Sequence, residues 1–552
     1  MKINKFRTIV ISIIVIVFLT AGFIFKKDDD FFEIAKNIDI FTRVYKEIAF
    51  GYVDGVNPEE FLRAGIRGML NTLDPYTVFI DEKKQEDIDL ITNGRYGGIG
   101  VTIGIRDDNV SIMEIMDGYS AQKQGLSIGD IITDVNGIKI SPKNIDDVGS
   151  LVKGEPGTFV KLHVLRAGVL DTLSFELPRE EIKLKNIIYS GFYPETGNIA
   201  YIKLTSFSRS GGEELKNVLL DLKRQKNIEG IILDLRNNPG GLLDVAADVA
   251  NKFLAKGQLI VATRGRDSAS LKQYFSSQEP LLKDSKLVVL VNEGSASASE
   301  IVAGAIQDHD RGVILGQKSF GKGLVQTIIP LSYNTSLKVT TAKYFTPSGR
   351  CIQKINYSKD NKVFTEVDSL NTIPFQTDRN RTVFSSGGIL PDSIVDTNED
   401  PALIRDMLAK GLFFKFVNRL QTDAPKEKLE KYSGTELFEL LMKYLKQEKY
   451  TFVSDVEKKL EDITKLASKQ KQYIKLSSNL LDLQEQARII ANSDFNKSRV
   501  EILSEVQVEI ASRLRGSSGR IKETMKSDHQ LNIAVDVLEN ESVYNKLLKG
   551  TK

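Results

Sequence analysis

Residues 288–300 constrain the fold of this chain more than any other segment. A run of β-branched residues ends at Asn292 and leads into a loop of small residues that contains three serines. A helical pattern begins at Glu300, because apolar residues recur on one face at Ile301, Ala305 and Ile306. The segment therefore predicts a strand, a tight turn and the start of a helix. Such a turn places a serine hydroxyl beside unpaired backbone N–H groups, which can bind an oxyanion.

The base that would activate such a serine is not expected to be a histidine. Of the three histidines, His309 is predicted at the far end of the same helix, roughly 15 Å or more from the serine, as an exposed helix-end residue. His163 belongs to a predicted strand of another domain, and His529 to a polar tail segment. A lysine can act instead if burial or a positive neighbour lowers its pKa from about 10.4. The segment Gly316 to Gln326 contains lysines that could act in this way.

These two segments resemble the carboxyl-terminal processing peptidases, serine-lysine proteases that cleave extracytoplasmic proteins near their C-termini. The resemblance covers the chain up to about residue 400. It implies that Ser297 is the nucleophile, that Lys322 is the base, and that Gln326, one helical turn beyond the lysine, orients the ammonium. It also implies two oxyanion donors, the backbone N–H of Ala298 and one from the glycine pair Gly240-Gly241. Which glycine donates is left open.

Residues 89–180 resemble a PDZ domain. The segment Tyr96 to Ile103 is a glycine turn that leads into an alternating strand, and Gly125 to Gly137 matches the most recognisable PDZ segment. The resemblance implies that a glycine loop binds the C-terminal carboxylate of a peptide, which adds as a strand to a sheet edge. The donors would be the N–H groups of Gly98, Ile99 and Gly100. Arg166 would couple peptide binding to the protease core; the alternative is an ordinary surface arginine.

Strand and helix patterns alternate over the predicted protease core, residues 181–400. The strands are expected at 198–204, 230–235, 259–263 and 287–291, and the helices at 213–222 and 242–254. This alternation predicts an α/β sheet with parallel pairing and right-handed crossovers. The resemblance implies a core of the crotonase and Clp-protease kind. The catalytic loops follow strand C-terminal ends, where the sites of α/β proteins usually lie.

Helical patterns dominate the two flanking regions. Residues 31–88 contain two amphipathic stretches, the second of which starts after Asn57-Pro58 as cap and first-turn proline. The resemblance implies that this region helps to pair protomers in a homodimer; core packing alone explains the apolar stripes equally well. Residues 401–552 predict an all-α domain with a loop at Arg515 to Gly519. This domain could pack on the core, bind an adaptor partner or cover the substrate groove.

Residues 1–30 carry the only targeting signal. The uncharged apolar run from Thr8 to Phe25 spans about 27 Å as a helix, near the thickness of a bilayer core. We expect an uncleaved single-pass anchor in the inner or cytoplasmic membrane; a cleaved signal peptide, and hence a secreted protein, is the alternative. On either interpretation, and from the resemblance, the catalytic part is periplasmic or otherwise extracytoplasmic.

Composition narrows the functional classes. The chain has 75 basic and 73 acidic residues and a net charge of +2, so no strong field favours nucleic acid. The single cysteine, Cys351, excludes an internal disulfide and a cysteine-based zinc site. No metal or phosphate motif is present, and no cofactor is expected. The sequence therefore predicts an endopeptidase acting on proteins or peptides with a free C-terminus. A PDZ-based scaffold or chaperone-like binder with a vestigial core is the alternative.

Overall fold

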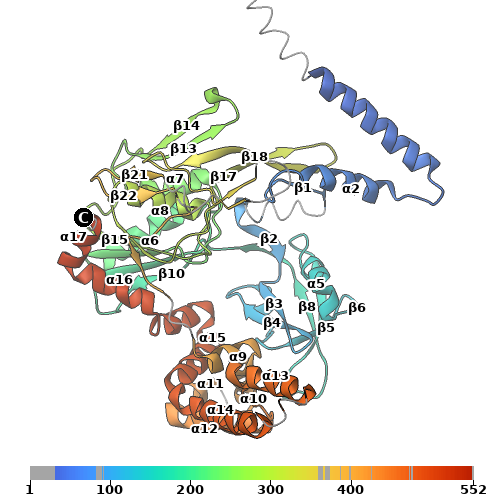
Figure 1. The fold of residues 1–552 in the computed structure, drawn as a ribbon, viewed down its shortest axis with the longest axis vertical. Coiled ribbons are helices and arrows are strands. Elements are labelled where there is room, and N and C mark those ends of the chain that lie inside the picture. The colour runs from blue at the N-terminus through green and yellow to red at the C-terminus, as the bar shows by residue number, and fades with distance from the viewer. Residues whose placement is uncertain are drawn as a thin grey trace, which may run out of the picture. The chain divides into compact units, whose positions relative to one another are not determined.

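The computed structural model describes residues 31–82, 90, 92–357, 365–366, 373–385, 387–396, 400–423, 426–470, 473 and 476–549. The chain forms two compact units, Met1–Phe79 and Ile80–Lys552 (Figure 1). In the first unit, residues 31–51 and α2 (Pro58–Leu70) are helical, as the apolar periodicity predicts. The side chain of Asn57 caps α2 by accepting from the N–H groups of Glu59 and Glu60.

The membrane prediction is corrected. The expected anchor, Thr8 to Phe25, lies outside the described residues. In the part of the chain that the structure describes, no helix combines the length and the apolar character that a bilayer crossing requires. A single-pass membrane location is therefore not assigned to this protein.

The centre of the second unit is a sheet with the strand order β10-β11-β12-β15-β16-β23. All neighbours pair in parallel except β10 and β11, which are antiparallel. Helices α6, α7 and α8 cover one face of this sheet, and α16 and α17 cover the other. The elements are β10 (Ile187–Phe192), β11 (Ile199–Leu204), β12 (Gly230–Asp234), β15 (Lys286–Val291), β16 (Val313–Gly316), β23 (Ser393–Ile394), α6 (Gly211–Gln225), α7 (Leu243–Asn251), α8 (Ala298–Asp308), α16 (His529–Glu539) and α17 (Glu541–Lys549).

Burial on both faces explains why these strands read as continuous apolar runs. Along β15, Leu287 and Val289 face the cluster under α7 and α8, while Val288 and Leu290 face the cluster under α16. The predicted parallel α/β core is thus confirmed. The last helices of the chain are part of this core, because they supply one of its two covering layers.

One predicted core strand belongs to a different sheet. The segment expected at 259–263 is β13 (Leu259–Gly265), which pairs antiparallel with β14 (Lys272–Phe275) and β18 (Ser336–Phe345). The strand β17 (Leu324–Pro330) pairs antiparallel with the other edge of β18. This sheet carries the segment that follows Lys322.

The PDZ region is built on the strand order β3-β4-β5-β7-β8, with β6 beside β5. The short ribbon β2 (Arg95–Gly98) pairs with β9 (Glu180–Lys183), and α5 (Ile145–Val152) contacts β3. In the described sheet β3 is an edge strand, so one side of it is open to an added strand. The sheet strands are β3 (Val101–Arg106), β4 (Asn109–Ile115), β5 (Ile131–Val135), β6 (Ile138–Lys139), β7 (Phe159–Leu165) and β8 (Leu173–Pro178).

The C-terminal region is helical, as predicted. Its helices pack around their own apolar cluster, and Ser433 with Glu436 forms a capping box at the start of α12. The loop expected at Arg515 to Gly519 is instead a kink inside α15, where only Gly516 leaves helical geometry, with φ 62° and ψ −158°. The helices are α9 (Ala402–Ala409), α10 (Leu412–Asp423), α11 (Lys426–Leu429), α12 (Gly434–Gln447), α13 (Asp455–Lys469), α14 (Ser477–Lys497) and α15 (Arg499–Met525).

Candidate active site

Ser297 lies in the tight turn between β15 and α8, which confirms the predicted strand, turn and helix. It is the N-cap of α8, with φ 55° and ψ −111°. This backbone conformation is one that residues with a β-carbon rarely adopt, and it persists only when the surroundings hold it in place. Strain of this kind is typical of functional sites. The surrounding residues must therefore hold the main chain of Ser297 in this conformation.

A buried carboxylate, Glu300, holds the serine turn. The N–H of Ser297 donates to Glu300 Oε2 at 2.8 Å, and the N–H of Lys322 donates to the same oxygen at 3.0 Å. The other oxygen, Oε1, accepts from the N–H of Gly321 at 2.7 Å and from the hydroxyl of Ser319 at 2.6 Å. One carboxylate therefore ties the turn of the predicted nucleophile to the loop of the predicted base.

Tyr344 on β18 holds the other side of the turn. Its hydroxyl donates to the carbonyl oxygen of Ser297 at 3.2 Å, and its side chain is buried. Burial raises the pKa of Tyr344 well above its usual range, so the hydroxyl stays a donor. Burial also raises the pKa of Glu300 to about 7, although four hydrogen bonds favour its ionised form.

Lys322 and Gln326 are both half-buried, but they do not lie on a helix. Lys322 precedes β17, and Gln326 lies within this strand, where its amide donates to Thr340 Oγ1 at 3.1 Å. The expectation of one helical turn between them is wrong. The run from Leu324 to Ile329 is rich in β-branched residues, which favour a strand. The pairing register of β17 with β18 shifts between Val325 and Gln326.

The predicted oxyanion loop lies against the serine. A β-carbon at Gly240, where φ is +104°, would come within 2.9 Å of Ser297 Cβ and of the nitrogen of Ala298. The N–H of Gly240 donates to Asn238 Oδ1 at 2.9 Å. Among the described residues, the N–H groups of Gly241 and Ala298 have no acceptor. These two groups are therefore better placed than the N–H of Gly240 to receive an oxyanion.

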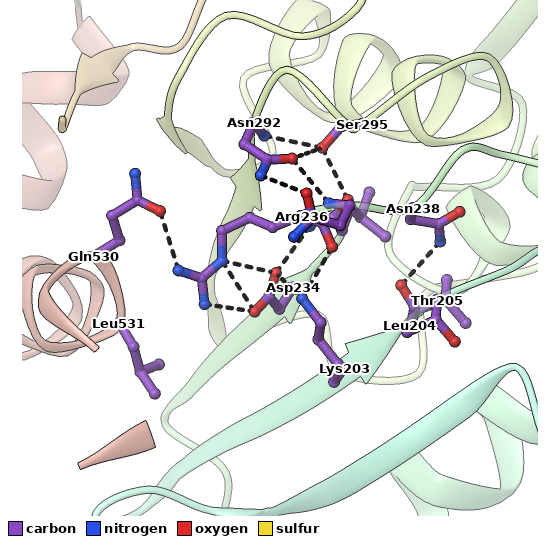
Figure 2. A network of polar contacts seen from close by, with 12 residues as sticks. Lys203, Leu204, Thr205, Asp234, Arg236, Asn238, Asn292, Ser295, Gln530 and Leu531 are labelled. Carbon is purple, nitrogen blue, oxygen red and sulfur yellow. Dashed lines mark hydrogen bonds and ion pairs between the residues drawn. The ribbon is translucent and has the colours of Figure 1, made fainter. Parts of the chain in front are cut away.

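A network of polar side chains lies beneath the oxyanion loop (Figure 2). Asp234, fully buried at the end of β12, bonds Arg236, Lys203 and the hydroxyl of Tyr201. Burial opposes its ionisation, but the cations Lys203 and Arg236 keep the pKa of Asp234 well below its usual range. The sequence contained no signal for this network.

Polar bonds also fix the loop main chain. The N–H of Asn237 donates to Asn292 Oδ1 at 2.8 Å, and the amide of Asn238 donates to the carbonyl of Leu204 at 2.8 Å. The two serines that flank Ser297 contribute as well. Ser295 Oγ donates to the carbonyl of Leu235, and Ser299 Oγ donates to that of Asn238. The neighbouring serines thus bind the oxyanion loop, and neither is placed as a second nucleophile.

The hydrogen bonds given for His163 and His309 are to groups other than Ser297 and Lys322. His309 is the C-cap of α8, as expected, but its side chain is only 8% exposed, so the expectation of an exposed residue is wrong. Its ring nitrogens lie 2.7 Å from Asp378 Oδ2 and 2.7 Å from the carbonyl oxygen of Leu259. His163 lies on β7 of the PDZ region beside Asp134, and His529 is the first residue of α16.

The predicted peptide-binding residues of the PDZ region adjoin the edge strand β3. Close packing explains why glycines occupy positions 98 and 100. A β-carbon at Gly98 would lie 2.8 Å from the ring of Tyr96, and one at Gly100 would lie 2.7 Å from Tyr119 Cβ. Ile99 is buried in the PDZ core, so only its backbone is available for binding.

Arg166 follows β7 and binds within the PDZ region. Its guanidinium donates twice to Asp130, at 2.7 Å each, and once to the carbonyl of Gly125 at 2.8 Å. It also lines a cavity of about 310 Å³ with Asn418 and Thr422 of α10. Arg166 therefore faces the C-terminal helices, and its predicted coupling to the protease core stays a prediction.

Comparison with known proteins places these features in a family. Family models match residues 198–363 (Peptidase family S41), 111–166 (PDZ domain) and 403–538 (probable PDZ-protease, C-terminal helical domain). The chain is 38% identical over 331 residues to a carboxy-terminal-processing protease of Bartonella bacilliformis, covering 59% of this chain and 74% of that protein. It is 33% identical over 322 residues to the carboxy-terminal processing protease CtpB of Bacillus subtilis, and the match covers 58% of this chain and 66% of that protein.

A solved structure of a photosystem II D1 C-terminal processing protease is 26% identical, covers 64% of this chain and 92% of that chain, and has a TM-score of 0.35. The α/β core, the PDZ region and the C-terminal helices agree with the three matched models. The chain therefore belongs to peptidase family S41, among the PDZ-containing carboxy-terminal-processing proteases.

Proposed function

We propose that this protein is a serine endopeptidase that cleaves protein substrates near their C-termini, with Ser297 as nucleophile and Lys322 as base. One observation carries the proposal. The main-chain N–H groups of these two residues donate to one oxygen of Glu300, so a serine on a strained turn and a lysine from a distant segment are neighbours. An ordinary structural turn does not require such a link between the two segments.

The reaction follows from this arrangement. Lys322 in its neutral form takes the proton of the Ser297 hydroxyl as the oxygen attacks the scissile carbonyl. The N–H groups of Ala298 and Gly241 stabilise the resulting oxyanion. Collapse of the tetrahedral intermediate expels the amine, which leaves with the proton from Lys322, and an acyl-enzyme remains. Water then attacks the acyl carbonyl as Lys322 accepts its proton. Collapse of this second intermediate breaks the ester bond to Ser297, whose oxygen takes the proton back from Lys322 as the carboxyl product leaves. Gln326 orients the lysine.

The PDZ region would recognise the C-terminus of the substrate. A peptide C-terminus can add as a strand along the open edge of β3 while its carboxylate accepts from the N–H groups of the loop at Gly98, Ile99 and Gly100. Only a loop with little side-chain bulk allows several N–H groups to converge on one carboxylate. The extracytoplasmic character of the substrates stays a prediction of the resemblance.

Cleavage of an unfolded protein substrate by the wild type and by Ser297→Ala tests the proposal. We expect turnover by the wild type and none by the variant, with the same free energy of unfolding within about 1 kcal/mol. A fluorophosphonate probe should label Ser297 of the wild type, which mass spectrometry of the peptides can confirm. A wild type that binds peptides through its PDZ region but never cleaves them would instead favour the scaffold function.

A further inference from the structure

The C-terminal segment reaches the oxyanion loop through one arginine. Arg236 donates to both carboxylate oxygens of Asp528, at 2.6 and 3.0 Å, and to the side-chain oxygen of Gln530 at 3.0 Å. Figure 2 shows the guanidinium directed between Gln530 on one side and Asp234 on the other. Residues separated by about half of the chain thus share one cation.

Charge balance requires Asp528. The cluster contains the cations Lys203 and Arg236 and the anions Asp234 and Asp528, all of which have side chains no more than 17% exposed. A buried cluster of two cations and one anion would carry an uncompensated charge, which is strongly unfavourable. The C-terminal segment therefore supplies the charge that lets Arg236 remain buried under the loop.

Arg236 also begins the loop that leads to the oxyanion donor at Gly241. Its N–H donates to Asp234 Oδ1 at 2.9 Å, and its carbonyl oxygen accepts from the ammonium of Lys203 at 3.0 Å. The next residue, Asn237, exchanges two hydrogen bonds with Asn292 on the serine turn. A change in the direction of Arg236 would consequently move the main chain that leads to Gly241.

The two residues that hold Arg236 are themselves fixed. Asp528 caps α16 by accepting from the N–H of Leu531 at 3.0 Å. Gln530 is 2% exposed, and its amide donates to the carbonyl of Val395 beside β23 at 2.7 Å. Because the helix α16 packs on β12, β15 and β16, the pair is rigidly mounted on the core sheet. Rigid support of this kind is what a preorganised site needs.

We propose that Asp528 and Gln530 are positioning residues for the peptidase site, acting on the oxyanion loop through Arg236. The end of the C-terminal region is then required for turnover itself as well as for stability. This inference rests on the proposed function, because the loop matters only if it stabilises an oxyanion.

The test compares Asp528→Asn with a matched control in the full-length protein. The control is Tyr544→Phe, which removes the bonds between the Tyr544 hydroxyl and Leu287 that dock α17 on β15 but leaves Arg236 untouched. We expect Asp528→Asn to lower kcat for a peptide substrate about tenfold or more with little change in KM, since loss of one oxyanion donor costs about 10²–10³. Tyr544→Phe should keep kcat within about twofold.

Further variants separate positioning from folding. Gln530→Leu preserves the charge balance and should lower kcat less than Asp528→Asn does, while Asp528→Glu should restore part of the activity. If Asp528→Asn fails to fold, Gln530→Leu carries the test, and full activity in that variant overturns the inference. Equal kcat in Asp528→Asn and Tyr544→Phe also overturns it. If the wild type shows no turnover, the proposed function and the inference are both wrong. If the wild type is active, the variants test the inference alone.

Discussion

Gly240 lies so close to Ser297 that a β-carbon at position 240 would stand 2.9 Å from the β-carbon of the serine. Gly240→Ala should therefore displace the nucleophile or the oxyanion loop and lower kcat/KM about 100-fold or more. Gly257→Ala is the matched control, because φ is similarly positive there (+89°) but the added carbon meets nothing within 4 Å. The control should lose about 1 kcal/mol of stability and retain its activity. Similar kinetic losses in both variants would refute this prediction.

Replacing Lys322 by arginine should abolish turnover. Arginine preserves the positive charge but cannot give up its proton at accessible pH, so the base is lost. The exposed Lys318, four residues earlier in the same loop, provides the control, and Lys318→Arg should cleave a peptide substrate at nearly the wild-type rate. Turnover by Lys322→Arg within a few-fold of wild type would show that another group accepts the serine proton.

Protonation of Glu300 should switch the site off. The pKa of Glu300 is about 7, and its protonated form would lose an acceptor for the donors at Ser297, Lys322, Gly321 and Ser319. Activity should therefore fall as the pH is lowered through about 7. Tyr344, the other titratable group that faces Glu300, stays neutral because burial raises its pKa. A pH profile of kcat for Glu300→Gln should show lower activity, and its acidic limb should no longer include the titration of Glu300 but only that of the base.

The raised pKa of Glu300 also predicts that stability changes with pH in the direction opposite to activity. Folding raises the pKa of Glu300 from 4.5 to about 7, so the folded state binds more protons than the unfolded state between these values. Its contribution to the free energy of unfolding is full below pH 4.5 and is lost as the pH rises through about 7. Denaturation by urea at several pH values should show this slope in the wild type, and the slope should be absent in Glu300→Gln.

The interior position of His309 predicts that this residue is structural. His309→Gln should lower stability by about 1–3 kcal/mol, since it removes an exposed bond to Asp378 and a partly buried bond to the carbonyl of Leu259. The acidic limb of the pH profile of kcat should be unchanged. Disappearance of that limb in His309→Gln would identify the histidine as the base.

The PDZ prediction concerns the free C-terminus of the substrate. A peptide with an amidated C-terminus lacks the carboxylate, and charge-assisted hydrogen bonds contribute about 1.5–3 kcal/mol each. Amidation should therefore weaken binding at least about tenfold, which KM for matched acid and amide peptides can report. Equal KM values for the two peptides would leave the loop at Gly98 to Gly100 without a role in substrate selection.

Sequence patterns predict those parts of the structure that depend on local periodicity. The strand, turn and helix around Ser297 and the buried strand β12 follow from apolar runs and small-residue loops. The spacing from Ser297 to Glu300 is that of a capping box, which could have indicated the carboxylate. Its bonds to Gly321 and Lys322 could not be foreseen, because they join segments distant in sequence. The same holds for Tyr344 and for Asp528.

The helix prediction for Gln326 failed for a different reason. A spacing of four residues fits a helix. The run from Leu324 to Ile329 nevertheless forms a strand, because its β-branched residues favour one and because it pairs with β18. The charged neighbours Asp308, Asp310 and Arg311 make an exposed helix end the natural expectation for His309. Its ring is nevertheless buried, since β13 and the segment at Asp378 cover the end of α8.

Asp528 follows Lys322 in the chain by 206 residues, and this order has a consequence for biosynthesis. A ribosome makes the nucleophile, the base and the oxyanion loop long before it adds residues 528–530, so the nascent protein carries Arg236 without its second carboxylate. The helix α16, which covers one face of the core sheet, is absent at that stage too. On the proposed role of Asp528, the peptidase becomes competent only when residues 528–530 and α16 have been synthesised, and a nascent chain that lacks them has little capacity to cut its neighbours.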